Sequence, residues 1–316
     1  MSTERVVVVA DPIDREALAQ LARGPCRVVD ASADPKTLPQ HLADAWGLIV
    51  RSRTKVTKDL LAHAPRLELV ARAGVGVDNV DLAATAARGI RVVNAPAAAT
   101  QSVAELALTF YLLLVRGLSS SIAATRAGKW ERGTHGHELG GKTVGFVGYG
   151  RIAREVARRL EPFRATTLAF DPFVPASGDR TKMVALDELL AQSDIVSIHA
   201  ASTEENRHLI DARAIEKMKP GAFLVNVARG ALVDEAALLS ALASGRIGGA
   251  ALDVYEVEPP MNQQLLANPN VIPTPHMGAS THEAQARAGT DTVDEVLRAL
   301  KGEPLTALVP SPGGAR

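Results

Sequence analysis

Three residues whose side chains suit proton transfer and anion binding each follow an apolar run: Arg229, Glu258 and His276. An imidazole gives and takes a proton near neutral pH, and a carboxylate can orient it and stabilise its protonated form. A guanidinium offers a fixed set of donors to a carboxylate and a polarised carbonyl. Taken singly, Arg229 could be a surface ion-pair partner, Glu258 a solvated loop acid and His276 a capped loop histidine. Together they supply what the interconversion of a 2-hydroxy acid and a 2-oxo acid needs.

A glycine-rich segment indicates a second kind of site. The apolar run Thr143–Val147 ends at Gly148, and Gly150 and Ala153 complete a G-x-G-x-x-A pattern that opens a predicted helix. Gly148 permits a tight turn, Gly150 lets the backbone approach a pyrophosphate, and the helix amino terminus attracts its charge. Asp171 lies 23 residues after Gly148, where a ribose-binding acid is expected, and its charge disfavours a 2′-phosphate. The pattern predicts a site for NAD rather than NADP, although Asp171 could instead be a turn or cap residue.

Short β-branched runs alternate with helical segments along the chain, which favours parallel sheets covered by helices. Two doubly wound α/β units are expected. The predicted strands of the first unit are Val6–Ala10, Arg27–Val29, Leu48–Val50, Leu67–Ala71 and Arg91–Val93, and those of the second are Thr143–Val147, Thr167–Asp171, Ile195–His199, Phe223–Val227 and Ala250–Val254. Because ligands bind beyond the carboxyl ends of such strands, Arg229, Glu258 and His276 should face the dinucleotide.

Between the two units, residues 100–127 form one long helix candidate that is apolar almost all round from Val103 to Val115. Such a helix must be buried on more than one side, either between domains or in a subunit interface. Another helix is expected over Ser280–Leu300. The predicted domains are residues 1–96 with 281–316, and residues 97–280.

The composition excludes several classes of protein. The 316 residues include 35 Lys and Arg against 35 Asp and Glu, so the basic excess of a nucleic-acid-binding protein is absent. The single Cys26 rules out a disulfide framework and a cysteine-based zinc site. The stretch Val103–Val115 carries Glu105 and is too short to cross a bilayer, and no secretory signal is visible. A soluble cytoplasmic protein with no metal, nucleic-acid partner or membrane partner is expected.

Ordered motifs along nearly the whole chain resemble the D-isomer-specific 2-hydroxyacid dehydrogenase family, and within it the D-3-phosphoglycerate dehydrogenase branch. The motifs are G-L-I-V-R-S at 47–52, R-A-G-V-G-V-D-N-V-D at 72–81, G-K-W-E-R at 128–132, G-Y-G-R at 148–151, A-R-G at 228–230, A-L-D-V at 251–254 and P-H-M-G-A-S-T at 275–281. The resemblance implies a flavodoxin-like substrate domain and a Rossmann NAD domain, with an active-site cleft between them. It also implies a homodimer built on the helix after residue 100. Since the sequence stops soon after Pro310, a short form without a regulatory domain is expected.

The resemblance implies roles for individual residues. Arg229 would bind the substrate carboxylate and carbonyl, while Glu258 and His276 would form the acid–base pair, with His276 as the proton carrier. Ala73 and Gly74 would offer backbone N–H groups to the carboxylate. The residues expected around NAD are Val75, Gly148, Gly150, Arg151, Ile152, Asp171, Ala200, Val227, Ala228, Arg229, Asp253, His276 and Ala279.

Three further arginines bear on the substrate. Arg51, Arg72 and Arg132 stand where the phosphoglycerate branch has basic residues, and arginine suits phosphate recognition. They could instead be surface charges, in which case a small unphosphorylated oxo acid is favoured. Departures from the family pattern, such as Val75 for a common threonine and Ala200 in His199-Ala200-Ala201, weaken the substrate assignment and leave the reaction class intact.

The leading expectation is therefore the reversible NAD-dependent oxidation of a D-2-hydroxy acid, with 3-phosphoglycerate as the substrate in serine biosynthesis. The alternative enzyme is a hydroxypyruvate or glyoxylate reductase with the same chemistry. A third reading is a non-catalytic scaffold that senses NAD(H), because one branch of the family resembles transcriptional corepressors.

Overall fold

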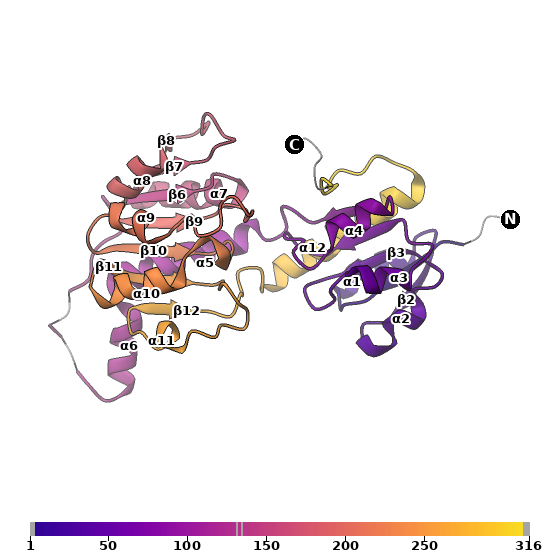
Figure 1. The fold of residues 1–316 in the computed structure, drawn as a ribbon, viewed down its shortest axis with the longest axis horizontal. Helices are drawn as coiled ribbons and strands as arrows, with labels where there is room; N and C mark the ends of the chain where they lie inside the picture. Colours follow the sequence, from indigo (N-terminus) through magenta and orange to yellow (C-terminus); the bar gives the residue numbers. More distant parts are fainter. Residues whose placement is uncertain (1–3, 131, 134, 312–316) are drawn as a thin grey trace. The chain divides into compact units, whose positions relative to one another are not determined.

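The computed structural model describes residues 4–130, 132–133 and 135–311 (Figure 1). The chain divides into two compact units, one made of residues 1–99 and 279–316 and the other of residues 100–278. Each unit is an α/β layer structure around a parallel sheet. The predicted class, two doubly wound parallel-sheet units, is confirmed.

The first unit holds a five-stranded sheet in the order β2-β1-β3-β4-β5, which is the flavodoxin-like order. Its elements are β1 (Val6–Val9), α1 (Arg15–Ala22), β2 (Arg27–Asp30), η1 (Pro35–Thr37), α2 (Leu38–His41), β3 (Ala45–Val50), α3 (Lys58–Ala62), β4 (Leu69–Arg72), α4 (Leu82–Ala87), β5 (Arg91–Asn94) and α12 (His282–Lys301). The chain reverses its direction of strand addition between β1 and β3. That is the topological switch point, where such folds bind ligands.

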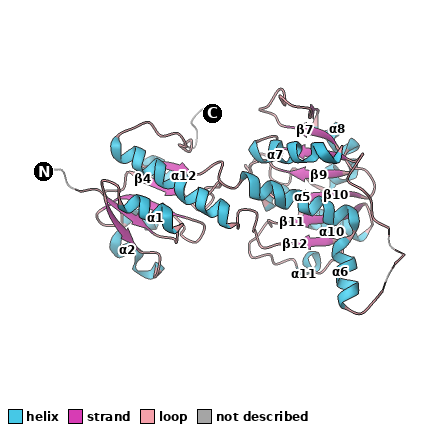
Figure 2. Ribbon diagram, turned by 180° about the vertical axis from the view of Figure 1, so that it is seen from behind, coloured by secondary structure: helices cyan, strands magenta, loops and turns pink. Residues whose placement is uncertain are grey.

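Alternation along the strands builds a core on both faces of this sheet. Val6 and Val8 pack with residues of α2 and α3, while Val7 and Val9 pack with α1 and α12. Figure 2 shows α12 beside α1, so a helix from the far end of the sequence completes the N-terminal unit. A strand with a period of two and two apolar faces must be covered on both sides, which explains why β1 is fully buried.

The second unit holds a seven-stranded parallel sheet in the order β12-β11-β10-β9-β6-β7-β8. Its elements are α5 (Thr100–Arg116), α6 (Leu118–Arg126), β6 (Thr143–Val147), α7 (Arg151–Leu160), η2 (Glu161–Phe163), β7 (Thr166–Phe170), β8 (Lys182–Met183), α8 (Leu186–Gln192), β9 (Ile195–Ile198), α9 (Ala212–Lys217), β10 (Ala222–Asn226), η3 (Gly230–Leu232), α10 (Glu235–Ala243), β11 (Ile247–Leu252), α11 (Gln263–Leu266) and β12 (Val271–Pro273). Helix α5 packs against α7, and α8, α9 and α10 pack in a row (Figure 1). The switch point of this Rossmann-type order lies between β6 and β9.

Capping side chains fix where several of the helices begin. In each case a side-chain oxygen accepts a backbone N–H of the first turn, which satisfies a donor that the helix itself leaves unpaired. The caps are Asp14 for α1, Thr57 for α3, Asp81 for α4, Asp211 for α9, Asp234 for α10 and Thr281 for α12. Helix α7 begins at Gly150 without such a cap.

The prediction of a single long helix over residues 100–127 is wrong. The structure has two helices, α5 and α6, bent by 69° at Gly117, which takes a left-handed backbone with φ of 58°. Glycine adopts that conformation without steric cost, so the break is local in origin. Within the described residues no single helix is long and apolar enough to cross a membrane, and only this bent pair passes by length and composition.

Candidate active site

The turn after β6 is shaped by a backbone contact that only glycine allows. Gly148 has φ of 90°, and a Cβ built on it would lie 2.6 Å from the backbone nitrogen of Ala200. Its N–H donates to the carbonyl of Phe170 at 2.8 Å. Because Gly148 follows β6 and Ala200 follows β9, this contact joins the loops on the two sides of the switch point. The structure thus brings together Gly148 and Ala200, both predicted at the cofactor site.

The amino terminus of α7 is open towards solvent. Gly150 supplies no side-chain cap, and a Cβ at this position would meet no atom within 4 Å. Arg151 is exposed and Ile152 half-buried, whereas Ala153 is fully buried against the sheet. Unpaired N–H groups and the helix dipole point at this space, so the residues present fit a pyrophosphate.

The carboxylate of Asp171 is hydrogen-bonded to the same turn, the one after β6. Its Oδ2 accepts the N–H of Tyr149 at 2.8 Å, and its Oδ1 accepts the N–H of Phe173 at 2.9 Å. Each carboxylate oxygen has a second lone pair, so the fixed acid can still accept hydrogen bonds from ribose hydroxyls. The side chain is therefore both a turn residue and a suitable ribose ligand.

A tight turn at the end of β10 fixes the backbone position of Arg229. The amide of Asn226 donates from Nδ2 to the carbonyl of Arg229 at 2.9 Å, and its Oδ1 accepts the N–H of Ala228 at 3.1 Å. A Cβ at Gly230 would lie 1.8 Å from the carbonyl carbon of Tyr255, so this glycine packs directly on the backbone after β11. Asn226 is buried and Arg229 half-buried. The segment that carries Arg229 is consequently fastened to the segment that carries Glu258.

Asp253 organises the loop that bears the histidine. This buried carboxylate accepts the hydroxyl of Thr274 at 2.6 Å and the N–H groups of Met277 and Gly278, both at 2.8 Å. Tyr255 adds hydrogen bonds from its hydroxyl to the carbonyls of Leu252 and Thr274, both at 3.0 Å. Burial raises the pKa of Tyr255 to about 12, so the phenol stays a donor.

Glu258 and His276 form a pair. Glu258 Oε2 lies 2.8 Å from Nδ1 of His276, and Glu258 Oε1 accepts the N–H of Tyr255 at 3.2 Å. The side chain of His276 is 50% exposed and that of Glu258 38% exposed. Because the ionised carboxylate only accepts, Nδ1 carries the proton and Nε2 is left to exchange one with a ligand. This arrangement suits general acid–base chemistry on a small molecule.

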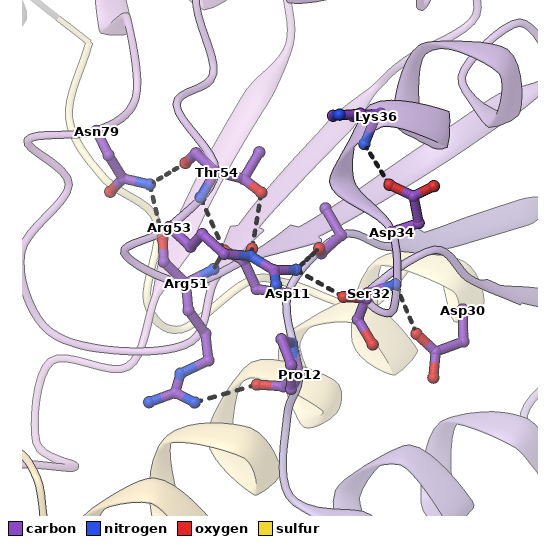
Figure 3. Close-up of polar contacts among 11 residues, drawn as sticks. Asp11, Pro12, Asp30, Ser32, Asp34, Lys36, Arg51, Arg53, Thr54 and Asn79 are labelled. Atoms are coloured by element: carbon purple, nitrogen blue, oxygen red, sulfur yellow. Dashed lines mark hydrogen bonds and ion pairs between the residues drawn. The ribbon is translucent and has the colours of Figure 1, made fainter.

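The first unit places Arg51 and Arg72 at the same sheet edge. Arg51 directly follows β3, Arg72 ends β4, and Val50 pairs with Arg72 across the two strands. A Cβ at Gly74 would lie 1.7 Å from Nη1 of Arg72, so this glycine, with φ of 150°, makes room for the guanidinium. Figure 3 shows the surroundings of Arg51.

The amides expected to bind a substrate carboxylate are already engaged. Ala73 N–H donates to the carbonyl of Val50 at 2.8 Å, and Gly74 N–H to the carbonyl of Arg72 at 2.9 Å. A role for Ala73 and Gly74 therefore stays a prediction, and it would require these amides to exchange partners. Val75 is half-buried, and its carbonyl accepts from the side chain of Asn94 at 2.6 Å.

The remaining predicted residues are placed as follows. Val227 and Ala228 are buried beside Arg229, whereas Ala279 and Arg132 are exposed. Within the part of the chain that the structure describes, no group of three His, Cys, Asp or Glu side chains could hold a metal ion.

Sequence reasoning missed a buried polar chain behind the glycine turn. The hydroxyl of Tyr111 on α5 donates to Oγ of Ser197 at 2.6 Å, and that oxygen lies 2.9 Å from Nε2 of His199. Burial lowers the pKa of His199 to about 3, so the ring is neutral. Asn226 and Thr274 were missed as well. Their positions at strand ends were the available signal, since ligand-facing loops follow the strands.

The fold and these contacts define a class: an α/β protein with a glycine-rich dinucleotide turn and a hydrogen-bonded Glu–His pair at strand ends of one Rossmann-type unit. Residues 108–278 match the family model of the D-isomer specific 2-hydroxyacid dehydrogenase, NAD binding domain. The chain belongs to this family, and its second unit is the family's NAD-binding domain.

Individual relatives agree with this membership. The chain is 45% identical over 314 residues to D-3-phosphoglycerate dehydrogenase of Mycobacterium leprae, covering 98% of this chain and 59% of that protein. It is 40% identical over 299 residues to hydroxypyruvate reductase of Thermotoga maritima, covering 93% of this chain and 98% of that protein. A glyoxylate reductase structure from Paecilomyes thermophila is similar with a TM-score of 0.88 at 31% identity, covering 98% of this chain and 99% of that one. The chain thus spans about three fifths of the length of the M. leprae relative.

Proposed function

We propose that this chain catalyses the reversible NAD-dependent oxidation of a D-2-hydroxy acid to a 2-oxo acid. The observation that carries the proposal is the pair formed by His276 and Glu258, 2.8 Å apart, on loops fastened to Asp253 and to the segment of Arg229. A carboxylate-backed imidazole and an arginine, carried by loops of a unit that fits a dinucleotide, supply the polar groups of this reaction.

Each residue has a definable task. Bound NAD supplies the hydride acceptor for oxidation and, once reduced, the hydride donor for the reverse reaction. Nε2 of His276 takes the proton of the substrate hydroxyl, and Glu258 stabilises the imidazolium that results. In the direction of reduction His276 returns that proton to the carbonyl oxygen. Arg229 binds the carboxylate and polarises the carbonyl, so the substrate is oriented before the proton moves.

The proposed substrate is 3-phosphoglycerate, oxidised to 3-phosphohydroxypyruvate in serine biosynthesis. The names of relatives at 45% identity support this choice. The placement of Arg51 and Arg72 at adjoining strand ends of the first unit also supports it, because a phosphate needs cations at a ligand-binding edge. The first unit is accordingly proposed as the substrate domain.

A hydroxypyruvate or glyoxylate reductase is the second candidate. The T. maritima relative named hydroxypyruvate reductase is matched over 98% of its length, whereas the M. leprae dehydrogenase is matched over 59%. The same His276, Glu258 and Arg229 would serve that reaction, so the two candidates differ only in the use of the arginines of the first unit.

A panel assay separates the candidates. NADH consumption is followed with phosphohydroxypyruvate, hydroxypyruvate and glyoxylate, and kcat/KM is compared. The proposal expects a preference for the phosphorylated acid, whereas a preference for hydroxypyruvate would assign the chain to the reductase. NADH binding without oxidation by any of the three acids would contradict both and favour a non-catalytic NAD(H) sensor.

We also propose that the chain forms a homodimer in the cytoplasm. Helix α6 exposes Leu118 and Ile122, with 36% and 44% of their surface accessible, which favours a contact with a second copy. The free thiol of Cys26, the chain's single cysteine, is typical of a reducing compartment. Sedimentation equilibrium should give twice the mass of the chain, and an Ile122→Asp variant should reduce that mass to one copy.

A further inference from the structure

A second polar cluster lies at the switch point of the first unit. Asp11 comes two residues after β1, and the segment Arg51–Thr54 directly follows β3. Strands β1 and β3 are neighbours in the sheet and stand where the strand order reverses. In a flavodoxin-like order this crevice is the expected ligand position.

Asp11 holds the backbone of the segment after β3. Only 1% of its surface is accessible, and Oδ2 accepts the N–H of Arg51 at 2.6 Å and that of Thr54 at 3.1 Å. Oδ1 accepts the hydroxyl of Thr54 at 2.7 Å and Nε of Arg53 at 3.0 Å (Figure 3). Burial alone would raise the pKa of Asp11, but the hydrogen bonds from Thr54, Arg51 and Arg53 lower it below the ordinary value. Every named partner is a donor, so the site requires the carboxylate form.

The two arginines of this segment have different tasks. Arg53 is committed to the fold, because its Nη2 donates to the carbonyls of Ala10 and Ser32 at 2.9 and 2.8 Å while its Nε bonds Asp11. The side chain of Arg51 makes one hydrogen bond, from Nη1 to the carbonyl of Pro12 at 3.1 Å. Within the described residues no carboxylate forms an ion pair with Arg51, and Figure 3 shows its guanidinium turned away from Asp11.

Asn79 holds the same segment from its other side. Its Nδ2 donates to the carbonyls of Arg51 and Thr54, both at 2.6 Å. Asp11 therefore holds the N–H groups of the segment and Asn79 holds its carbonyls. With both sides fixed, the direction in which the Arg51 side chain leaves the backbone is fixed as well.

We propose that Asp11 is a positioning residue that fixes segment 51–54 and thereby aims the guanidinium of Arg51 at the phosphoryl group of the substrate. The inference rests on the phosphorylated substrate proposed above. Asp11 itself touches no substrate in this account. It acts through the backbone of Arg51, and the Arg53 ion pair compensates the buried charge that this requires.

The test replaces Asp11 by Asn, which keeps the shape but turns one acceptor into a donor facing N–H groups. The measured quantity is the ratio of kcat/KM for phosphohydroxypyruvate to kcat/KM for hydroxypyruvate. D11N should lower this ratio about tenfold, through KM for the phosphorylated acid, as expected for a lost charged hydrogen bond. D30N is the matched control, because Asp30 is exposed, ends β2 and, among the described residues, accepts only the N–H of Ser32, so its ratio should equal that of the unmodified chain.

A variant with a smaller change keeps the test usable should D11N fail to fold. Thr54→Val preserves the shape of the side chain and removes only the hydroxyl that Asp11 accepts at 2.7 Å. It should lower the same ratio by less than D11N does, about threefold, because Asp11 keeps its other donors from Arg51, Arg53 and the Thr54 backbone.

A double-mutant cycle asks whether Asp11 works through Arg51. R51A should lower the ratio, and D11N combined with R51A should give the same ratio as R51A alone. A further drop in the double variant, or an equal loss on both acids in D11N, would overturn the positioning role. An unchanged D11N ratio in a chain that prefers the phosphorylated acid would overturn it too. If the unmodified chain shows no such preference, the phosphorylated substrate proposed above fails first, and the role of Asp11 falls with it.

Discussion

The proposed proton carrier, His276, owes its position to backbone geometry as much as to its partner Glu258. His276 has φ of 52°, a left-handed conformation that costs a non-glycine residue about 1 kcal/mol. The next two N–H groups, of Met277 and Gly278, both donate to the buried carboxylate of Asp253, which offsets that cost. Residues in such conformations gather at functional sites. The local strain and the Glu258 contact therefore belong to one arrangement that presents Nε2.

At this scale the charge of Glu258 is the property to test. E258Q keeps an acceptor for Nδ1 of His276 but removes the charge that stabilises the imidazolium. We expect kcat to fall on the order of a hundredfold, with the Kd for NADH unchanged, because Glu258 contributes to proton transfer. Stopped-flow turnover and NADH fluorescence titration measure the two quantities. The exposed Glu161, changed to Gln, is the control, and an equal loss in both variants would mean that Glu258 has no special role.

Among the elements, the dinucleotide turn contains two glycines that are needed for different reasons. Gly148 is needed by the fold, and Gly150 by the ligand. Gly148 must be glycine because Ala200 occupies the space of a side chain and because φ is positive. Gly150 has φ of −83° and open space around its Cβ position, so the fold itself does not require glycine there. The helix after it, α7, presents unpaired N–H groups at the same place.

These two glycines predict opposite outcomes. G150A should fold with an unchanged Tm. It should lose NADH affinity about tenfold or more, because the added methyl group would occupy the position expected for the pyrophosphate. G148A should lower the Tm, because the added Cβ meets the backbone of Ala200. Calorimetry and NADH fluorescence measure both properties. A normal NADH Kd in a folded G150A would show that the dinucleotide does not approach Gly150.

Sequence periodicity located most of the elements and left out those with no periodic signal. Continuous apolar runs marked the buried strands such as β6 and β9. The two-residue β8 and three-residue β12 are too short to show any pattern, and the bend at Gly117 depends on one backbone angle. The motifs indicated Arg229, Glu258 and His276, and the structure brings the last two into contact.

Contacts between distant residues could not be predicted from the sequence. Asp11 and Arg51 are 40 residues apart, and their bond exists because β1 and β3 become neighbours in the sheet. The same holds for Tyr111 and Ser197, which join α5 to β9. A sequence pattern shows which residues end strands, whereas only the strand order shows which ends adjoin.

In the molecule as a whole, each of the two units contributes one switch point to the proposed function. The first carries Asp11 and Arg51 between β1 and β3, and the second carries the dinucleotide turn between β6 and β9. The core behind the second includes the neutral ring of His199, whose Nδ1 has no hydrogen-bond partner within the described residues. A buried neutral histidine links the stability of that unit to pH.

The stability of the second unit should therefore fall with acid. The unfolded chain protonates His199 below about pH 6.5, whereas burial holds the pKa of the folded ring at about 3. This contribution is fully present above pH 6.5 and is lost at about 1.4 kcal/mol per pH unit as the pH falls towards 3. Urea unfolding at pH 7.0 and 5.5 should differ less in H199N than in the unmodified chain, while a variant of the exposed His63 should not change the difference. Equal pH dependence in H199N would contradict a neutral buried ring.

The central claim is that His276 carries the proton while the rest of the second unit holds NADH. Its most direct measurement is the pair of values kcat and NADH Kd for H276A, with H63A as the control. We predict that kcat falls at least a hundredfold and that the NADH Kd changes less than about twofold. Turnover close to that of the unmodified chain, or a parallel loss of NADH binding, would contradict it.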